Sequence, residues 1–141
     1  MRPSKTHARP TDAEIEILNV LWERGPATVR VVHEAIAQNK PTQYTTTLKL
    51  MQIMAAKGLL DRDESERSHV YTAAIPREHT RQQMAGHLME RAFAGSLRSL
   101  VVSALGGRRA TKQELDDLRS LIEEHEQPAA RRAAPRRGRT R

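Results

Sequence analysis

The sequence predicts a mainly α-helical fold with one small β-hairpin, and three observations support this. Apolar residues recur three and four positions apart over several segments, as on the buried face of a helix. The aromatic content is only 3%, so the core must be built from aliphatic residues and Met, which suits packed helices. The segment Leu59–Thr72 differs, because two short apolar stretches flank a charged tip, which is typical of a hairpin.

Length and composition limit the class of protein. A chain of 141 residues suggests one main domain, or one domain with an appendage. It has no Cys, which excludes disulfides, thiolate metal sites and Cys nucleophiles. No apolar run approaches the roughly 20 residues of a membrane span, and residues 1–10 lack the apolar segment of a signal peptide. We therefore expect a cytoplasmic protein.

The net charge of +7 is concentrated at the C-terminal end of the chain. Residues 127–141 hold six of the 24 basic residues and no acid, which leaves 18 basic and 17 acidic residues in 1–126. Evidence for nucleic-acid binding must therefore come from local charge. The segment 127–141 is expected to be disordered, and either attracts phosphates or is an inert solubilising tail. Residues 1–10 are expected to be a disordered arm, either solvated or close to phosphates.

The first helix is expected from Thr11 to the Gly25-Pro26 pair that ends it. Its start is a capping box, because the Thr11 hydroxyl can accept from the Glu14 amide while the Glu14 carboxylate reaches back. Trp22 is interpreted as a core anchor rather than a ligand platform. The predicted buried face consists of Ile15, Leu18, Leu21 and Trp22.

Two further helices are expected over residues 29–38 and 42–57. Thr28 is a good N-cap for the first of them, and Gly58 directly after Lys57 is a usual stop for the second. In the second helix, four residues at helical spacing are predicted to face the core, namely Thr47, Leu50, Met51 and Met54.

The opposite face of the helix over 42–57 is polar, and its cations Lys49 and Lys57 have no acid in the same helix. Hydroxyls and amides can hydrogen-bond to phosphates or base edges, and Lys49 adds charge. An ordinary solvated face is the alternative. Two short helices before it and a hairpin after it favour the recognition helix of a winged helix-turn-helix. The candidate DNA-binding residues on this helix are Gln43, Tyr44, Thr45, Thr46 and Lys49.

The hairpin is interpreted as the wing. Leu60, Val70 and Tyr71 are expected to lie against the helices. Arg62, Arg67, Ser68 and His69 could reach a phosphate backbone or the minor groove. The wing also carries acids, which repel phosphates, so Arg67 and Ser68 are favoured as its DNA contacts. The acids are Asp61, Asp63, Glu64 and Glu66, and the other basic wing residues are Arg62 and His69.

After residue 76 the pattern is helical only, with helices expected over 78–93, 97–105 and 111–126 and a loop at Gly106-Gly107. Three short amphipathic helices cannot easily bury their faces alone, so we predict pairing with a second copy in a symmetric dimer. An independent bundle packed on the first domain is the alternative. The candidate dimerisation residues are Leu88, Phe93, Leu97, Leu100, Val101, Leu115, Leu118 and Ile122.

These segments suggest four parts. They are an N-terminal arm (1–10), a winged-helix DNA-binding domain (11–75), a helical dimerisation domain (76–126) and an Arg-rich tail (127–141). No cofactor or metal is expected. No GxSxG, HExxH or Gly-rich phosphate loop frames the scattered His residues, so an enzyme is not predicted.

Several strings, together with the order of the parts, resemble the penicillinase repressors of the BlaI/MecI/CopY type. The resemblance covers residues 11–126. It rests on Glu14–Trp22, Thr28–Val32, Tyr44–Thr47, Lys57–Leu60, Arg67–Tyr71, Ser99–Val102 and Glu114–Leu118.

The resemblance implies a homodimeric transcriptional repressor whose winged domains bind a palindromic operator. Family operators commonly carry TACA/TGTA half-sites. Carried over by position, the same residues of the helix over 42–57 bind DNA, with Arg67 and Ser68 on the wing. Ile53 is a departure, since members often have a basic residue there.

The family also suggests how such a repressor is released. Classical members are inactivated when a membrane metallopeptidase sensor triggers cleavage in the dimerisation helix, after an Asn-Phe type pair. The matching positions here are Ser103 and Ala104. Copper-responsive relatives use C-terminal Cys residues, which this chain lacks, so copper sensing by that route is excluded.

The leading hypothesis is thus a DNA-binding repressor. The alternative is a winged-helix protein-interaction module without sequence-specific DNA binding, which the acids of the wing favour.

Overall fold

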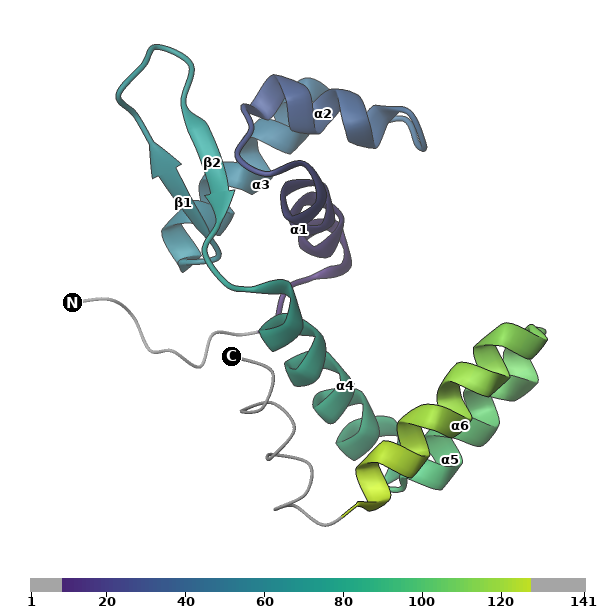
Figure 1. Cartoon of the computed structure of the whole chain (residues 1–141). Helices are drawn as coiled ribbons and strands as arrows, with labels where there is room; N and C mark the ends of the chain where they lie inside the picture. Colours follow the sequence, from purple (N-terminus) through teal and green to yellow (C-terminus); the bar gives the residue numbers. More distant parts are fainter. Residues whose placement is uncertain (1–8, 128–141) are drawn as a thin grey trace, which may run out of the picture. The chain divides into compact units, whose positions relative to one another are not determined.

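The computed structural model describes residues 9–127 of the chain, so most of the N-terminal arm and of the Arg-rich tail lie outside the described residues. The described part is mainly helical with one two-stranded hairpin, which confirms the predicted fold class (Figure 1). The elements are α1 (Asp12–Arg24), α2 (Val29–Ala37), α3 (Tyr44–Lys57), β1 (Leu60–Asp63), β2 (Val70–Ala73), α4 (Arg77–Phe93), α5 (Leu97–Gly107) and α6 (Lys112–Glu126).

The chain divides into two compact units, which meet within α4 between Leu88 and Met89. Each unit is described by itself. None of the helices in residues 9–127 is both long and apolar enough to cross a membrane.

The helix ends follow from local sequence. The capping box of α1 is present, with Thr11 Oγ1 accepting from the Glu14 amide at 3.2 Å and Glu14 Oε1 accepting from the Thr11 amide at 3.0 Å. Thr28 caps α2 by accepting from the Val31 amide. Gly58 ends α3 in the left-handed region, with φ of 88°, as predicted for a glycine stop.

Helix α3 begins two residues later than predicted, at Tyr44. The Thr42 hydroxyl donates to the Lys40 carbonyl at 3.3 Å, so it is turned away from the amides of the helix. Gln43 takes the N-cap position with extended backbone and no side-chain capping bond.

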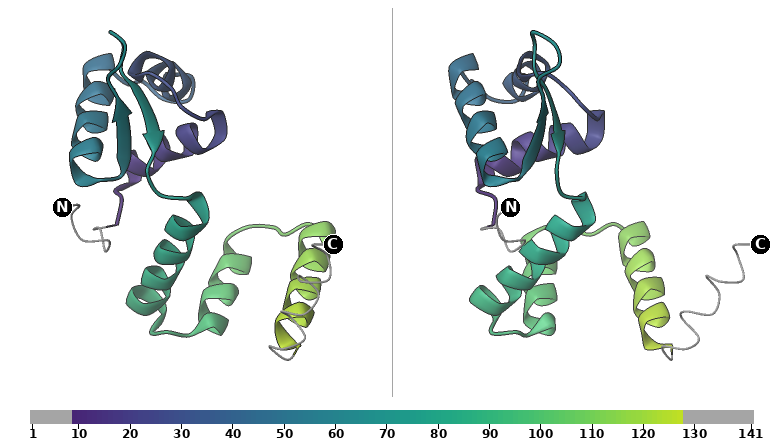
Figure 2. Two further views of the ribbon diagram at one scale, coloured as in Figure 1. Left: turned by 60° about the vertical axis from the view of Figure 1, so that its left-hand side comes forward. Right: turned by 90° about the vertical axis from the view of Figure 1, so that its left-hand side faces the viewer.

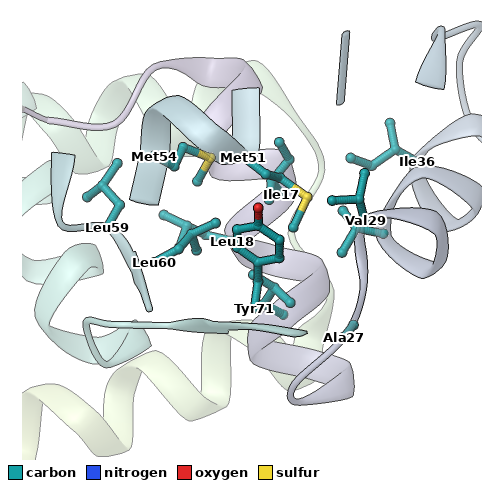
Figure 3. Packing of buried hydrophobic residues seen from close by; sticks show 12 residues of the cluster. Ile17, Leu18, Ala27, Val29, Ile36, Met51, Met54, Leu59, Leu60 and Tyr71 are labelled. Atoms are coloured by element: carbon teal, nitrogen blue, oxygen red, sulfur yellow. The ribbon is translucent and has the colours of Figure 1, made fainter. Parts of the chain in front are cut away.

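The core of the first unit lies where α1, α2, α3 and the hairpin meet (Figure 3). The buried face of α1 is centred on Ile17 and Leu18, whereas Ile15 and Trp22 are half-buried and pack against this core. The Trp22 indole nitrogen donates to the Ile75 carbonyl at 3.0 Å, which fixes the chain where it leaves the hairpin.

The hairpin is held from two sides. Its strands are antiparallel with Leu60 opposite Ala73, and they pack on α3 and α1 (Figure 2). The Tyr71 backbone also exchanges two hydrogen bonds with Ala27, at 2.8 and 3.0 Å. Because Leu60 and Tyr71 are both buried, the wing is anchored in the core, as predicted.

The second unit buries little of its own surface. Neither α5 nor α6 contains a buried residue. The predicted capping box at the start of α6 is confirmed, and the pKa of Glu114 is held below its usual value by the Thr111 amide and then by Arg108. The predicted loop at Gly106-Gly107 is wrong, because both residues form the last turn of α5. Neither takes a positive φ, and glycine is tolerated in a helix at a cost of about 1 kcal/mol.

A buried ion pair joins the first and third helices. Glu14 is only 3% exposed, and its two carboxylate oxygens lie 2.8 and 3.1 Å from Lys57 Nζ. The acid that opposes Lys57 therefore comes from α1, and Lys57 is not a free cation of α3. The pair fixes the start of α1 against the end of α3.

We expect Lys57→Met to destabilise the first unit by about 1–3 kcal/mol, because it leaves the Glu14 carboxylate buried and unpaired. Lys57 is itself 35% exposed, so the loss stays below the 3–5 kcal/mol typical of a fully buried pair. Urea unfolding measures the change. Lys40→Met is the matched control, since the pair of Lys40 with Glu16 is exposed and contributes about 0–1 kcal/mol. Equal losses in the two variants would contradict this role of Glu14.

Candidate nucleic-acid interface

The outer face of α3 is polar and accessible. All five residues predicted to bind DNA here are exposed, while Thr47, Met51 and Met54 on the opposite face are buried. Lys49 forms no ion pair with another residue in the described range 9–127. The helix therefore presents hydroxyls, an amide and an unopposed cation to solvent. Their DNA-binding roles stay a prediction.

Tyr44, at the start of α3, is held in place by α2. Its ring meets the His33 ring edge to face, with centroids 5.7 Å apart. The guanidinium carbon of Arg30 lies 6.0 Å from the Tyr44 centroid, within reach of a cation–π contact. His33 Nδ1 also lies 3.4 Å from the hydroxyl oxygen of Thr47. These contacts link the exposed aromatic ring to the buried face of α3, so its position depends on α2.

A cleft of about 430 Å³ lies between α2, α3 and the wing. It brings Arg67 and Ser68 of the wing to the same hollow as Tyr44 of α3. His69 and Arg30 line it as well, and no described acidic residue does. Two arginines and a histidine around a cleft without acids form an electropositive hollow, as a phosphate-binding surface requires.

Two of the four acids of the wing, Asp63 and Glu64, form contacts within the wing itself. Asp63 Oδ1 accepts from the Ser65 amide at 2.9 Å, and this bond lowers the pKa of Asp63. Glu64 lies 2.7 Å from Arg62. Hydrogen bonding to Tyr71 and the charge of Glu64 raise the pKa of Arg62. Arg62 is therefore a neutralised cation, and two of the four acids shape the tip instead of facing the cleft.

Sequence reasoning missed Arg30 and Gln52, which both line the cleft. It treated α2 only as a support for α3. The available signal was the position of Arg30 on the first turn of α2, two residues after the N-cap Thr28, where an exposed cation is not needed for the fold. Within residues 9–127, no group of three or more His, Asp or Glu residues could hold a metal ion.

Comparisons with known proteins give a consistent result. Residues 10–124 match the family model described as "Penicillinase repressor". The chain is 32% identical to "Transcriptional regulator BlaI" of Mycobacterium tuberculosis, covering 82% of this chain and 83% of that protein. It is 24% identical to "Penicillinase repressor" of Bacillus licheniformis, covering 82% and 90%. It is 20% identical to "Methicillin resistance regulatory protein MecI" of Staphylococcus aureus, covering 79% and 91%.

The structure distinguishes basic side chains that are available for phosphate contacts from basic side chains that already pair with an acid. We expect Lys49→Ala and Arg67→Ala each to lower the slope of log affinity against log salt by about one for every bound chain, because each is predicted to remove one phosphate contact per chain. Duplex binding titrated at several salt concentrations measures the slope.

Arg62→Ala is the matched control for this measurement, because its charge is already balanced by Glu64. It should leave the slope unchanged. A slope that falls equally in Arg62→Ala and Arg67→Ala would contradict the assignment of the cleft.

Proposed function

The chain belongs to the penicillinase repressor family, and from this premise we propose that it represses transcription as a homodimer bound to a palindromic operator. The family consists of transcriptional repressors rather than enzymes. The operator symmetry, the dimer and the route of release are the parts proposed for this chain.

One observation supports DNA reading above the others, namely that the polar face of α3 borders a cationic cleft without acids. A helix of this kind fits the major groove, where hydroxyl and amide side chains can bond base edges. In the proposal, Gln43, Thr45 and Thr46 face the bases. Lys49 and Arg67 contact phosphates. Ser68 and the Tyr44 ring lie at the border of the surface that contacts DNA.

The wing supports the interaction-module alternative less than its sequence suggested. It was favoured by the acids of the wing, but Asp63 and Glu64 are engaged by Ser65 and Arg62. No described acid faces the cleft. The wing is therefore compatible with a phosphate backbone on its Arg67 side.

The second unit supports the dimer. Exposed fractions reach 62% for Leu97, 41% for Val101, 42% for Leu118 and 58% for Ile122, although all four are apolar. Phe93, Leu100 and Leu115 are half-buried. Exposed apolar side chains at helical spacing along α5 and α6 are typical of an interface, and in the proposal a second copy covers them. Leu88 of α4 is proposed as a further dimer contact. Two winged domains would then reach two half-sites, about one helical turn apart.

Leu100→Asp tests this arrangement. We expect the charge to split the dimer and lower operator affinity by about 100-fold or more. A single chain can bind only one half-site and loses the contribution of the other. Light scattering gives the mass in solution, and a duplex selected from a random library gives the affinity, with random DNA as competitor.

Ser99→Asp is the matched control, since it adds the same charge at the adjacent, exposed position, which lies about 100° around the axis of α5 from Leu100. It should keep two chains per duplex. Unchanged mass and affinity in Leu100→Asp would contradict the proposal, as would wild-type binding that random DNA abolishes.

We further propose that an external signal releases the repressor by cleavage in α5 at the Ser103-Ala104 pair, with a membrane metallopeptidase sensor system as the partner. Both residues are exposed in the single chain. A protease needs extended substrate, so α5 must first open. The adjacent Gly106 and Gly107 favour opening, because each weakens the helix by about 1 kcal/mol relative to Ala.

Replacing both glycines by Ala should slow cutting within α5 by roughly 30-fold, the factor expected from about 2 kcal/mol of added helix stability. Added Cβ atoms meet nothing within 4 Å at either position. Elastase, which accepts small side chains, serves as the probe, and mass spectrometry locates the cuts.

Gly86→Ala in α4 is the matched control, since its added Cβ also meets nothing within 4 Å. It should leave the cutting of α5 unchanged. A chain cut at the Ser103-Ala104 pair that keeps its dimer and its operator affinity would contradict this route of release.

A further inference from the structure

Ile53 is an exposed aliphatic residue on the recognition helix, with 42% of its surface accessible. It follows Lys49 by one helical turn and lies about 40° further around the helix axis. It therefore shares the outer face that carries the proposed DNA contacts, on the side away from the buried Met51 and Met54.

The fold does not use Ile53. It is absent from the core cluster and from the partly buried residues that pack against that cluster. A β-branched side chain also lowers helix propensity slightly, because it loses χ1 freedom. An exposed Ile in the middle of α3 therefore contributes little to the stability of the free chain.

The C-terminal half of the outer face of α3 has no free charge. Its exposed residues are Gln52, Ile53 and Ala56, and Lys57 at the end of the helix is held by Glu14 at 2.8 Å. This half cannot attract phosphates by charge. It offers mainly apolar surface, with one amide beside it.

In the major groove, the apolar feature is the C5-methyl group of thymine. The other groups of the base edges are hydrogen-bond donors and acceptors, which lose water without compensation when an aliphatic side chain covers them. An Ile on a helix in the groove is therefore accommodated best beside thymine.

We propose that Ile53 is a specificity-determining residue that contacts a thymine methyl group in each half-site of the operator. This inference rests on the proposed function, because it requires α3 to lie in the major groove. Lys49 and Arg67 then supply phosphate affinity, and Ile53 supplies discrimination at a base that no charged side chain reads.

The test uses the full chain and duplexes selected by it from a random library. Each thymine is replaced by deoxyuridine, which keeps the hydrogen-bonding groups and removes only the methyl. Each half-site should contain one position where replacement, made in that half-site alone, weakens wild-type binding about fourfold. This factor corresponds to ~0.8 kcal/mol for one buried carbon group. Replacement in both half-sites should weaken binding by about 15-fold, because distant effects add.

Ile53→Ala should bind the thymine and deoxyuridine duplexes within twofold of each other at that same position. Val31→Ala is the matched control, since Val31 is an exposed aliphatic residue on α2 with 36% of its surface accessible. It should keep the wild-type preference for thymine. A thermal melt of each variant checks that its fold is intact.

The outcomes separate this inference from the proposed function. Selected duplexes that bind equally well with and without every thymine methyl would overturn the role of Ile53 and leave the repressor proposal standing. A methyl preference that persists in Ile53→Ala would do the same. A library that yields no enriched sequence would remove the proposed function, and this inference with it.

Discussion

The Glu14 carboxylate is the constraint on which the first unit depends. It accepts from the Thr11 amide at the start of α1 and pairs with Lys57 at the end of α3, 43 positions along the chain. One buried group thus caps α1 and fixes α3 against it. Because Lys57 is directed to Glu14, Lys49 is the one lysine of α3 that stands without an ion pair in the described residues, and it lies on the exposed face.

The wing depends on a second long-range tie. Tyr71 is buried in the core and its backbone pairs with Ala27, so the base of the hairpin is held at the linker between α1 and α2. The tip is shaped by its own acids, through the bonds from Ser65 and Arg62. With the base anchored and Asp63 and Glu64 engaged at the tip, the Arg67 side of the wing borders the cleft at α3.

Local rules predicted much of this fold. The caps at Thr11, Thr28 and Thr111 and the stop at Gly58 were readable because each depends on residues within about four positions. The polar face of α3 followed from periodicity.

What failed depends on tertiary contacts or on weak local signals. The Glu14–Lys57 pair, the Arg30–Tyr44 contact and the centring of α1 on Ile17 cannot be seen from spacing within one helix. The Gly106-Gly107 pair was wrongly predicted to be a loop. Glycine lowers the stability of a helix only slightly, and the other turns of α5 can offset that loss. The bases that α3 would contact and the residues that would meet in a dimer depend on a second molecule. They therefore cannot be predicted from the sequence of one chain.

The small buried surface of the second unit fits the proposal that the repressor dissociates from its operator on a signal. Helices α5 and α6 have no fully buried residue in the single chain, so in the proposed dimer much of the burial of their apolar surfaces comes from the second copy. Whatever separates the copies then removes the support of these helices together with the second half-site. In the proposal, operator binding stabilises the dimer, because a ligand that binds one state shifts the equilibrium toward it. A cut in α5 would then weaken both the dimer and its binding to the operator.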